Sequence, residues 1–210
     1  MYRSAVPDDP NSVKIGERGY HHGALRPALI AAAEAVIAER GVDGFSLRET
    51  ARRAGVSPSA PAHHFGDARG LLTAIATAGF EALGDALEAA SAAGDRDARI
   101  RAQGLAYVDF ALDRRARFDV MWRKALLDGE DEALIAAGRR AFALLDGAVR
   151  GEGAMRDGPA DPALAPSIAC WATVHGFARL AMDGAFGTGS GAAERAADSL
   201  LPLVLDRLTI

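Results

Sequence analysis

The sequence has little of what marks secreted or membrane-spanning proteins. Its single cysteine, Cys170, cannot form an intrachain disulfide. Residues 1–11 hold no apolar core of signal-peptide length, and the longest uncharged stretch, residues 162–177, falls short of the ~20 apolar residues that a membrane span needs. We therefore expect a cytoplasmic protein without a membrane segment.

The sequence also lacks strand patterns. From Leu25 onward the apolar residues recur at steps of three and four, which is the period of an amphipathic helix. The composition is half hydrophobic and 25% charged, which excludes disordered, collagenous and coiled-coil proteins. We predict an all-α fold of about nine helices without an internal repeat. Residues 1–19 lack the helical period, and we expect a mobile tail there.

Acidic residues outnumber basic ones only beyond the first third of the chain. Residues 1–72 hold nine Lys/Arg and eight Asp/Glu, whereas residues 73–210 hold fifteen and twenty. Four of the five histidines also lie within residues 1–72. If the protein contacts a polyanion, we expect the contact in this N-terminal part.

The stretch from Ser46 to Phe65, SLRETARRAGVSPSAPAHHF, has the spacing of a helix-turn-helix. Ser46 and Glu49 form a potential capping box for a helix over residues 47–54. Gly55 suits the left-handed position that ends this helix. Ser57 and Pro58 would supply the N-cap and first-turn proline of a second helix. Such a second helix can enter the DNA major groove.

Pro61 lies inside the predicted second helix. It lacks the amide that would bond to the Ser57 carbonyl, and it biases Ala60 away from helical geometry. We therefore expect an irregular start to that helix.

These residues resemble the TetR (tetracycline-repressor-like) family of bacterial transcription regulators. The likeness covers residues 20–72 through several motifs in order: Tyr20–Arg26, Gly41–Ser46, Ala51–Ser57, His64–Phe65 and Leu71–Leu72. Residues 171–180, WATVHGFARL, and residues 118–123, FDVMWR, are similar to a family subgroup with a Trp...His-Gly C-terminal domain. The resemblance implies a helix-turn-helix domain over residues 20–68, then a ligand-binding and dimerisation domain over residues 69–210.

The candidate DNA contacts lie at the start of each motif helix. Ser46 and Arg48 suit a phosphate at a helix N-terminus, although a plain cap beside a solvated arginine is an equal reading. Serine, alanine, proline and histidine on the second helix can meet base edges, and His64 suits phosphate contact or core closure better than base reading. The full set is Ser46, Arg48, Ser57, Pro58, Ser59, Ala60, Pro61, Ala62, His63 and His64.

Two positions depart from the family pattern. Ala62 and Ala68 stand where members usually carry tyrosine and lysine that contact phosphate. Their loss could weaken DNA binding or be compensated by other cations. The candidates are Arg48, Arg52, Arg53, Arg69, Lys14 and Arg18. An alternative function is therefore a small-molecule-binding or protein-interaction module with a weakened DNA head.

The C-terminal part is long enough for a helical bundle with an effector cavity. Its aromatic residues could line that cavity, although aromatic residues at helical spacing more often form a packed core. The candidates are Phe110, Phe118, Met121, Trp122, Phe142, Trp171 and His175. The resemblance implies a homodimer through the last two helices. The uncharged stretch from residue 163 suits burial against a second subunit. The expected partners are a double-stranded DNA operator and a small-molecule effector.

No cofactor, metal site or catalytic centre is expected. The adjacent pairs His21-His22 and His63-His64 point about 100° apart on a helix and do not chelate together. Cys170 and His175 are the only nucleophile and base to consider, and five helical steps place them on different faces. The sequence predicts a regulator rather than an enzyme.

Overall fold

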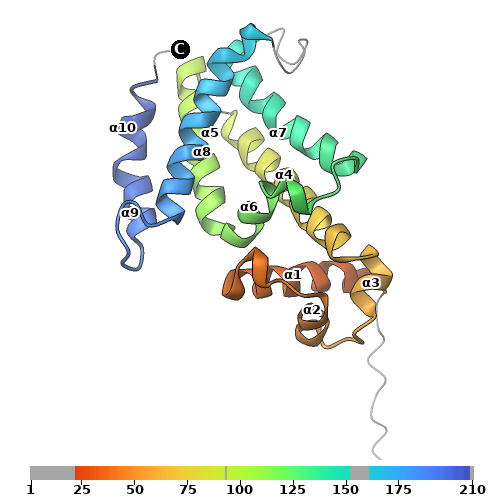
Figure 1. The fold of residues 1–210 in the computed structure, drawn as a ribbon. Coiled ribbons are helices and arrows are strands. Elements are labelled where there is room, and N and C mark those ends of the chain that lie inside the picture. Colours follow the sequence, from red (N-terminus) through yellow and green to blue (C-terminus); the bar gives the residue numbers. More distant parts are fainter. Residues whose placement is uncertain (1–21, 93, 152–160, 209–210) are drawn as a thin grey trace, which may run out of the picture.

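The computed structural model describes residues 22–92, 94–151 and 161–208. This part of the chain contains only helices, so the all-α prediction is confirmed (Figure 1). Three 3-10 turns, η1 (Val42–Gly44), η2 (Lys124–Leu126) and η3 (Pro162–Leu164), join the helices. The helices are α1 (His22–Arg40), α2 (Leu47–Ala54), α3 (Ala60–Phe65), α4 (Ala68–Ala90), α5 (Arg96–Asp113), α6 (Arg115–Met121), α7 (Glu132–Arg150), α8 (Ala165–Met182), α9 (Ala192–Ser199) and α10 (Leu201–Leu205).

Helix α4 connects the small N-terminal group of helices to the larger bundle. It packs against α5, α6 and α7, and buries Leu71, Ile75, Leu83 and Leu87. Among the described helices it alone has the length and apolar composition to cross a membrane, yet half of its apolar window is buried inside the protein. Its hydrophobicity therefore serves the bundle core.

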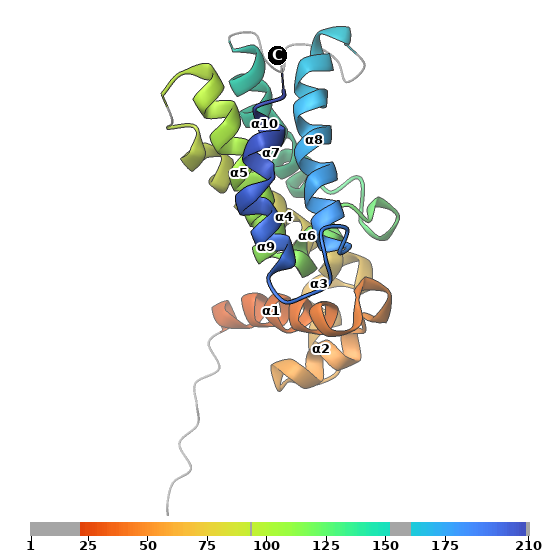
Figure 2. The ribbon, with the colours of Figure 1, turned by 90° about the vertical axis from the view of Figure 1, so that its left-hand side faces the viewer.

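The N-terminal helices form one end of the molecule. Figure 1 shows α1, α2 and α3 together below the bundle, with α1 lying across its lower end. Helix α1 contacts α6 as well as α2 and α4, so the two parts meet along an interface. On another side of the molecule, α9 and α10 follow one another end to end, α9 packs against α8 and α10 packs against α5 (Figure 2).

The helix boundaries correct some expectations. The predicted final helix, residues 192–208, is divided into α9 and α10 at Leu200, whose backbone lies outside the ideal helix. Pro202 explains the break, because it lacks the amide that would bond to the carbonyl of Asp198. The preceding helix, expected over residues 163–185, begins at Ala165 and ends at Met182.

Candidate DNA-binding surface and ligand cavity

The turn between α2 and α3 follows the predicted helix-turn-helix geometry. Helix α2 spans Leu47–Ala54 as expected and ends at Gly55, which has φ 68 in the left-handed region. The Gly55 amide donates to the Arg52 carbonyl at 3.3 Å, and the Val56 amide donates to the Ala51 carbonyl at 3.1 Å. These bonds satisfy the last carbonyls of α2 and turn the chain sharply toward α3.

The start of α4 is held close to the end of α3. The Asp67 side chain accepts a hydrogen bond from the Gly70 amide at 2.9 Å and caps α4. A Cβ atom on Gly70 would lie 1.9 Å from the Phe65 carbonyl oxygen. Only glycine permits this approach, so Gly70 fixes the position of α3 relative to α4.

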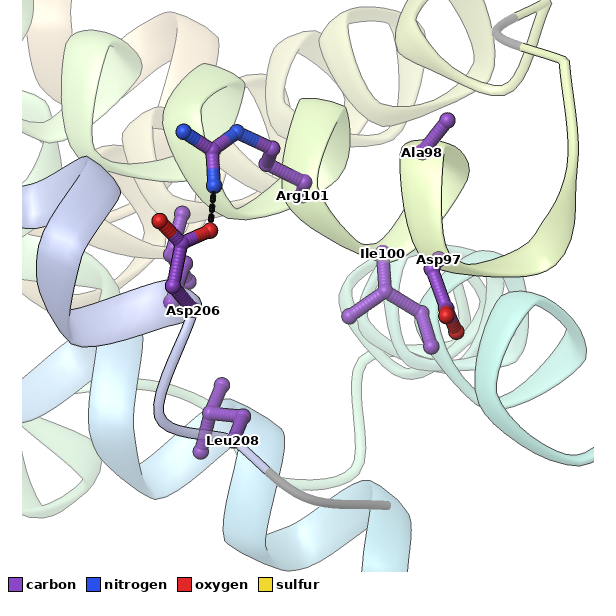
Figure 3. A pocket seen from close by; sticks show the side chains of 7 residues that line it. Asp97, Ala98, Ile100, Arg101, Asp206 and Leu208 are labelled. Atoms are coloured by element: carbon purple, nitrogen blue, oxygen red, sulfur yellow. Dashed lines mark hydrogen bonds and ion pairs between the residues drawn. The ribbon is translucent and has the colours of Figure 1, made fainter.

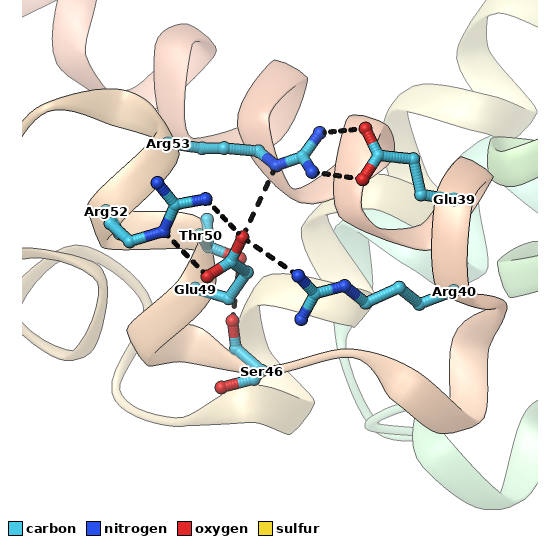
Figure 4. A network of polar contacts seen from close by, with 7 residues as sticks. All are labelled: Glu39, Arg40, Ser46, Glu49, Thr50, Arg52 and Arg53. Atoms are coloured by element: carbon cyan, nitrogen blue, oxygen red, sulfur yellow. Dashed lines mark hydrogen bonds and ion pairs between the residues drawn. The ribbon is translucent and has the colours of Figure 1, made fainter.

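The capping box expected at the start of α2 is wrong. Ser46 is the N-cap residue, but its side chain makes no capping hydrogen bond, and Glu49 does not reach back to it. The Glu49 carboxylate instead accepts from Arg52 at 2.9 and 2.7 Å and from Arg40 at 3.3 Å (Figure 4). Three arginines compete for Glu49, because Arg53 also lies 3.7 Å from it.

This charge network fixes two of the arginines considered as compensating phosphate contacts. Arg53 forms a two-pronged pair with Glu39 of α1, with one contact at 2.7 Å, and so ties α2 to α1. The hydrogen bond from Arg52 is the main cause that lowers the pKa of Glu49 to about 2. Glu49 therefore stays ionised at neutral pH and neutralises part of the arginine charge.

Arg48 and Arg69 remain available to phosphate. Both side chains are exposed, and neither makes an ion pair or side-chain hydrogen bond within the described part of the chain. Arg48 borders a surface hollow at the start of α2, together with Ser46 and Pro58. The exposed Ser46 hydroxyl is free of a capping role there. Lys14 and Arg18, the other proposed compensators, lie outside the described residues.

Helix α3 starts later than the sequence suggested. Its N-cap is Ser59, not Ser57, and Pro61 rather than Pro58 is the proline of its first turn. The irregular start expected from Pro61 is not found, because Ala60 is the first helical residue and Pro61 lies in the first turn; a tight turn, in which the Ala60 amide bonds to the Ser57 carbonyl at 3.0 Å, precedes the helix. The hydroxyls of Ser57 and Ser59 lie 3.2 Å apart.

The proposed base-contacting residues differ in exposure. Pro61 is buried, so the expectation that it is an exposed base-edge candidate is wrong. Ala60 and His64 are half-buried, and Phe65 packs against the main core beneath Arg26, whose guanidinium lies 4.9 Å from the ring centre. The exposed candidates are Ser57, Pro58, Ser59, Ala62 and His63.

Ala62 and Ala68 are exposed. The methyl groups at these positions offer no hydrogen bond to a phosphate. Sequence reasoning about which arginines replace them was incomplete, because it overlooked the pair between Arg52 and Glu49 within α2 and could not foresee the pair between Arg53 and Glu39 of α1.

A cavity of about 210 Å³ lies between helices of the bundle and opens to solvent. It is walled by α4, α5, α7 and α8, and by the segment from the end of α6 to η2. Its aromatic side chains contact one another: the ring centres of Trp122 and Trp171 lie 5.5 Å apart, and those of Phe80 and Trp122 lie 5.3 Å apart. The lining residues are Phe80, Leu83, Leu87, Tyr107, Trp122, Lys124, Gly138, Ala141, Phe142, Leu145 and Trp171.

Only part of the expected lining is present at this cavity. Trp122, Phe142 and Trp171 line it as predicted. Phe110, Phe118, Met121 and His175 do not line it, and the first three are buried in the core. Helical spacing brought these side chains toward the interior, but their neighbours fill the space around them.

His175 supports the cavity wall from behind. Its Nδ1 lies 2.9 Å from the Tyr107 hydroxyl, and its ring centre lies 4.7 Å from that of Trp122. Burial, assisted by the nearby Arg179 charge, lowers the pKa of His175 and favours the neutral ring. Burial likewise raises the pKa of the Cys170 thiol, which disfavours the nucleophilic thiolate.

Sequence reasoning missed Phe80, Tyr107 and Lys124. The helical period of α4 and α5 predicts that Phe80 and Tyr107 are buried, but it does not predict that they line the cavity. Lys124 could have been noticed as a lysine two residues after Trp122, next to a predicted helix end.

A larger hollow, about 410 Å³, is an open groove between α5 and α10 (Figure 3). Arg101 and Asp206 border it and form an ion pair with each other. Their charges are therefore already matched, whereas Lys124 beside the aromatic cavity makes no ion pair with any residue that the structure describes. The aromatic cavity is the better candidate for a ligand site.

Two family models match the chain. Residues 29–75 match the model described as bacterial regulatory proteins, tetR family. Residues 100–204 match the model described as tetracyclin repressor-like, C-terminal domain. No curated protein matches the chain.

Solved structures of similar fold span nearly the whole chain. A protein of unknown function from Rhodococcus sp. RHA1 is 38% identical, with TM-score 0.67, covering 88% of this chain and 97% of that one. A TetR family transcriptional regulator, PfmR, from Thermus thermophilus is 24% identical, with TM-score 0.65, covering 85% and 97%. A tetR family regulatory protein from Rhodococcus RHA1 is 22% identical, with TM-score 0.67, covering 88% and 96%. With both family models matched and the helix-turn-helix in place, the chain belongs to the TetR family of DNA-binding transcription regulators.

Proposed function

We propose that this protein is a cytoplasmic homodimeric repressor that binds a near-palindromic operator and leaves it when a small molecule occupies the aromatic cavity. Residues 20–68 serve as the DNA-binding domain and residues 69–210 as the effector-binding and dimerisation domain. The observation that carries the proposal is the combination of an exposed helix-turn-helix face with a separate aromatic-lined cavity.

The dimer surface is proposed on α8 and α10. Helix α8 carries an uncharged exposed row of small and aliphatic residues that includes Ile168, Ala172 and Leu180, and Leu180 is 50% exposed. Leu203 of α10 is 61% exposed. Small residues at helical spacing let a second helix approach closely, and exposed leucines on adjacent helices favour burial by a partner.

The DNA contacts are proposed from exposure and charge. Ser57, Ser59 and His63 face base edges, and Arg48 and Arg69 contact phosphate on either side of them. In a dimer, two copies of α3 would have to lie about 34–36 Å apart to enter successive major grooves. A small rotation of the subunits is then enough to lose one of the two contacts.

Helix α6 is the proposed link between cavity and DNA-binding head. Trp122, directly after α6, borders the cavity. Arg117 within α6 donates to Glu34 of α1 at 2.6 Å, and both side chains are largely buried. A ligand that displaces Trp122 therefore pushes on a helix that is tied to the DNA-binding head.

Selection of genomic fragments by the purified protein tests the proposed function. The expected result is enrichment of fragments that share a near-palindromic site, bound with steep salt dependence. Substitution of Ser59 or His63 should change which site is enriched, whereas Arg53→Ala should leave the preference unchanged. If the protein enriches no preferred fragment, its DNA-binding domain is weakened. The alternative function, a small-molecule-binding or protein-interaction module, then replaces the proposed repressor.

The dimer is tested separately by light scattering after size-exclusion chromatography. Leu180→Glu should give a monomer, because it buries a charge in the proposed apolar interface. Leu126→Glu is the matched control, since Leu126 is an exposed leucine of η2 on another part of the surface. A monomeric wild-type protein, or dimers in both variants, contradicts the proposed interface.

A further inference from the structure

The size of the aromatic cavity limits what it can hold. An apolar protein cavity of about 150 Å³ accommodates benzene, whereas sites for drug-sized molecules run from about 300 Å³ upward. At about 210 Å³, this cavity suits one aromatic ring with a short substituent. Its wall of tryptophan and phenylalanine rings favours an aromatic body, because ring edges and faces attract each other.

One of the lining residues, Trp122, has a buried hydrogen-bond donor without a partner. The Nε1 atom of Trp122 is buried and has no hydrogen-bond partner among the described residues. An indole N–H can only donate. The Tyr107 hydroxyl is not free in the same way, because it is bonded to His175. Because this N–H is shielded from solvent, an occupant of the cavity does not meet it directly, and the cation that borders the cavity is Lys124.

The charge beside the cavity has one sign. Lys124 is exposed at its rim and makes no ion pair with any residue that the structure describes. Among the residues that the structure describes, no aspartate or glutamate lines the cavity. A cationic ligand would meet a like charge and no counter-charge, whereas an anion would find an ammonium group near the opening.

Together these features point to one ligand class. We infer that the cavity binds a small aromatic carboxylate, with the ring among Phe80, Trp122, Phe142 and Trp171 and the carboxylate held by the Lys124 ammonium at the rim. The inference rests on the proposed function in that it takes this cavity as the effector site.

Three probes of similar size and different charge test the ligand class. Calorimetric titration of the purified protein with phenylacetate, phenylacetamide and 2-phenylethylamine compares an anion, a neutral molecule and a cation. Phenylacetate should bind about tenfold or more tightly than the amide, as expected for a charge-assisted hydrogen bond, and the amine should bind weakest. Equal or tighter binding of the amide or the amine overturns the inference, as does failure of phenylacetate to bind.

Lys124 also allows binding to be localised. The only lysines in the sequence are Lys14 and Lys124. Limited acetylation followed by mass spectrometry should show that phenylacetate protects Lys124, while Lys14 serves as the internal control. Equal modification of Lys124 with and without phenylacetate places the carboxylate elsewhere and overturns the assignment.

Variants isolate the contribution of the charge. Lys124→Met should weaken phenylacetate binding about tenfold and leave phenylacetamide binding unchanged, and Lys124→Arg should restore most of the loss. Arg139→Met is the control, because Arg139 is an exposed cation of α7 that does not line the cavity. Equal losses in Lys124→Met and Arg139→Met would reduce the effect to general electrostatics and contradict a direct contact.

The ligand class and the repressor function can fail independently. A mobility shift with a selected operator measures release of DNA by each probe. If phenylacetate binds and protects Lys124 but does not release DNA, the ligand class stands and the proposed effector role fails. If DNA is released by the amide or the amine while phenylacetate has no effect, the repressor function stands and the ligand class fails.

Discussion

Arg48 and Arg52 offer a matched test of how ion pairing controls DNA contact. Both are exposed arginines on α2, and they lie four residues apart on the same helical face. Arg52 donates to Glu49 at 2.9 and 2.7 Å, whereas Arg48 has no such partner in the described chain. The Glu49 carboxylate therefore already neutralises the Arg52 guanidinium, whereas no described carboxylate neutralises Arg48.

The expected effect of Arg48→Ala can be worked out from counterion release. Each phosphate contact contributes about 0.9 to the slope of log affinity against log salt, so loss of Arg48 from both subunits of the proposed dimer reduces the slope by about 1.8. Between 50 and 200 mM salt, a fourfold change, wild-type affinity should fall about 12-fold more than that of the variant. Arg52→Ala should change the slope by less than half as much.

Fluorescence anisotropy with a labelled operator, titrated at several salt concentrations, measures these slopes. Glu49→Gln provides a third arm: it frees Arg52, and the effect of a further Arg52→Ala substitution should then rise toward that of Arg48→Ala. The reasoning is refuted if Arg52→Ala alone lowers the slope as much as Arg48→Ala, because pairing with Glu49 would then have no influence on phosphate contact.

Three further predictions concern stability, measured by urea unfolding. Gly70→Ala should destabilise the protein by at least about 1–3 kcal/mol because its Cβ would meet the Phe65 carbonyl, whereas Gly147→Ala, with open space around it, should be neutral or stabilising by up to about 1 kcal/mol; equal effects contradict the close approach. Phe118→Ala should lower the free energy of unfolding by about 3–5 kcal/mol, and Phe142→Ala should lower it by less, since Phe118 is 0% exposed and Phe142 borders the cavity. A larger loss for Phe142→Ala would contradict the placement of Phe118 in the packed core. The pKa of Glu49 is lowered in the folded protein, so its ion pairs stabilise the fold at pH values above the pKa that Glu49 has in the unfolded chain. The stability advantage of wild type over Glu49→Gln should therefore persist above about pH 5 and disappear as the pH falls toward about 2. An advantage that does not depend on pH contradicts the ionic pairing.

The sequence predicted the features that depend on neighbouring residues. The bounds of α2 and the left-handed turn at Gly55 follow from helix-stop chemistry that acts over a few residues. The expected start of α3 near Ser57 was wrong, because Pro61 fits the first turn of a helix, where its missing amide costs no hydrogen bond, and the helix begins at Ala60. The capping box failed because Glu49 met arginines, including Arg40 of another helix, that bind a carboxylate more strongly than a backbone amide does.

The cavity shows where sequence reasoning stops. The helical period correctly predicted that Phe118 and Trp122 face the interior. It could not predict that Phe118 is fully packed whereas Trp122 borders the cavity. That difference depends on how α4, α5, α7 and α8 cross, which brings together side chains as distant in sequence as Phe80 and Trp171.

The amino-acid sequence by itself determined the helical class, the helix-turn-helix and the family, because hydrophobic period, caps and turn residues are local signals. The tertiary structure decided that Arg53 pairs with Glu39 of another helix, which aromatic residues border the cavity and where Lys124 lies relative to Trp122. These outcomes depend on contacts between residues far apart in the chain, and such contacts are set only when the helices pack.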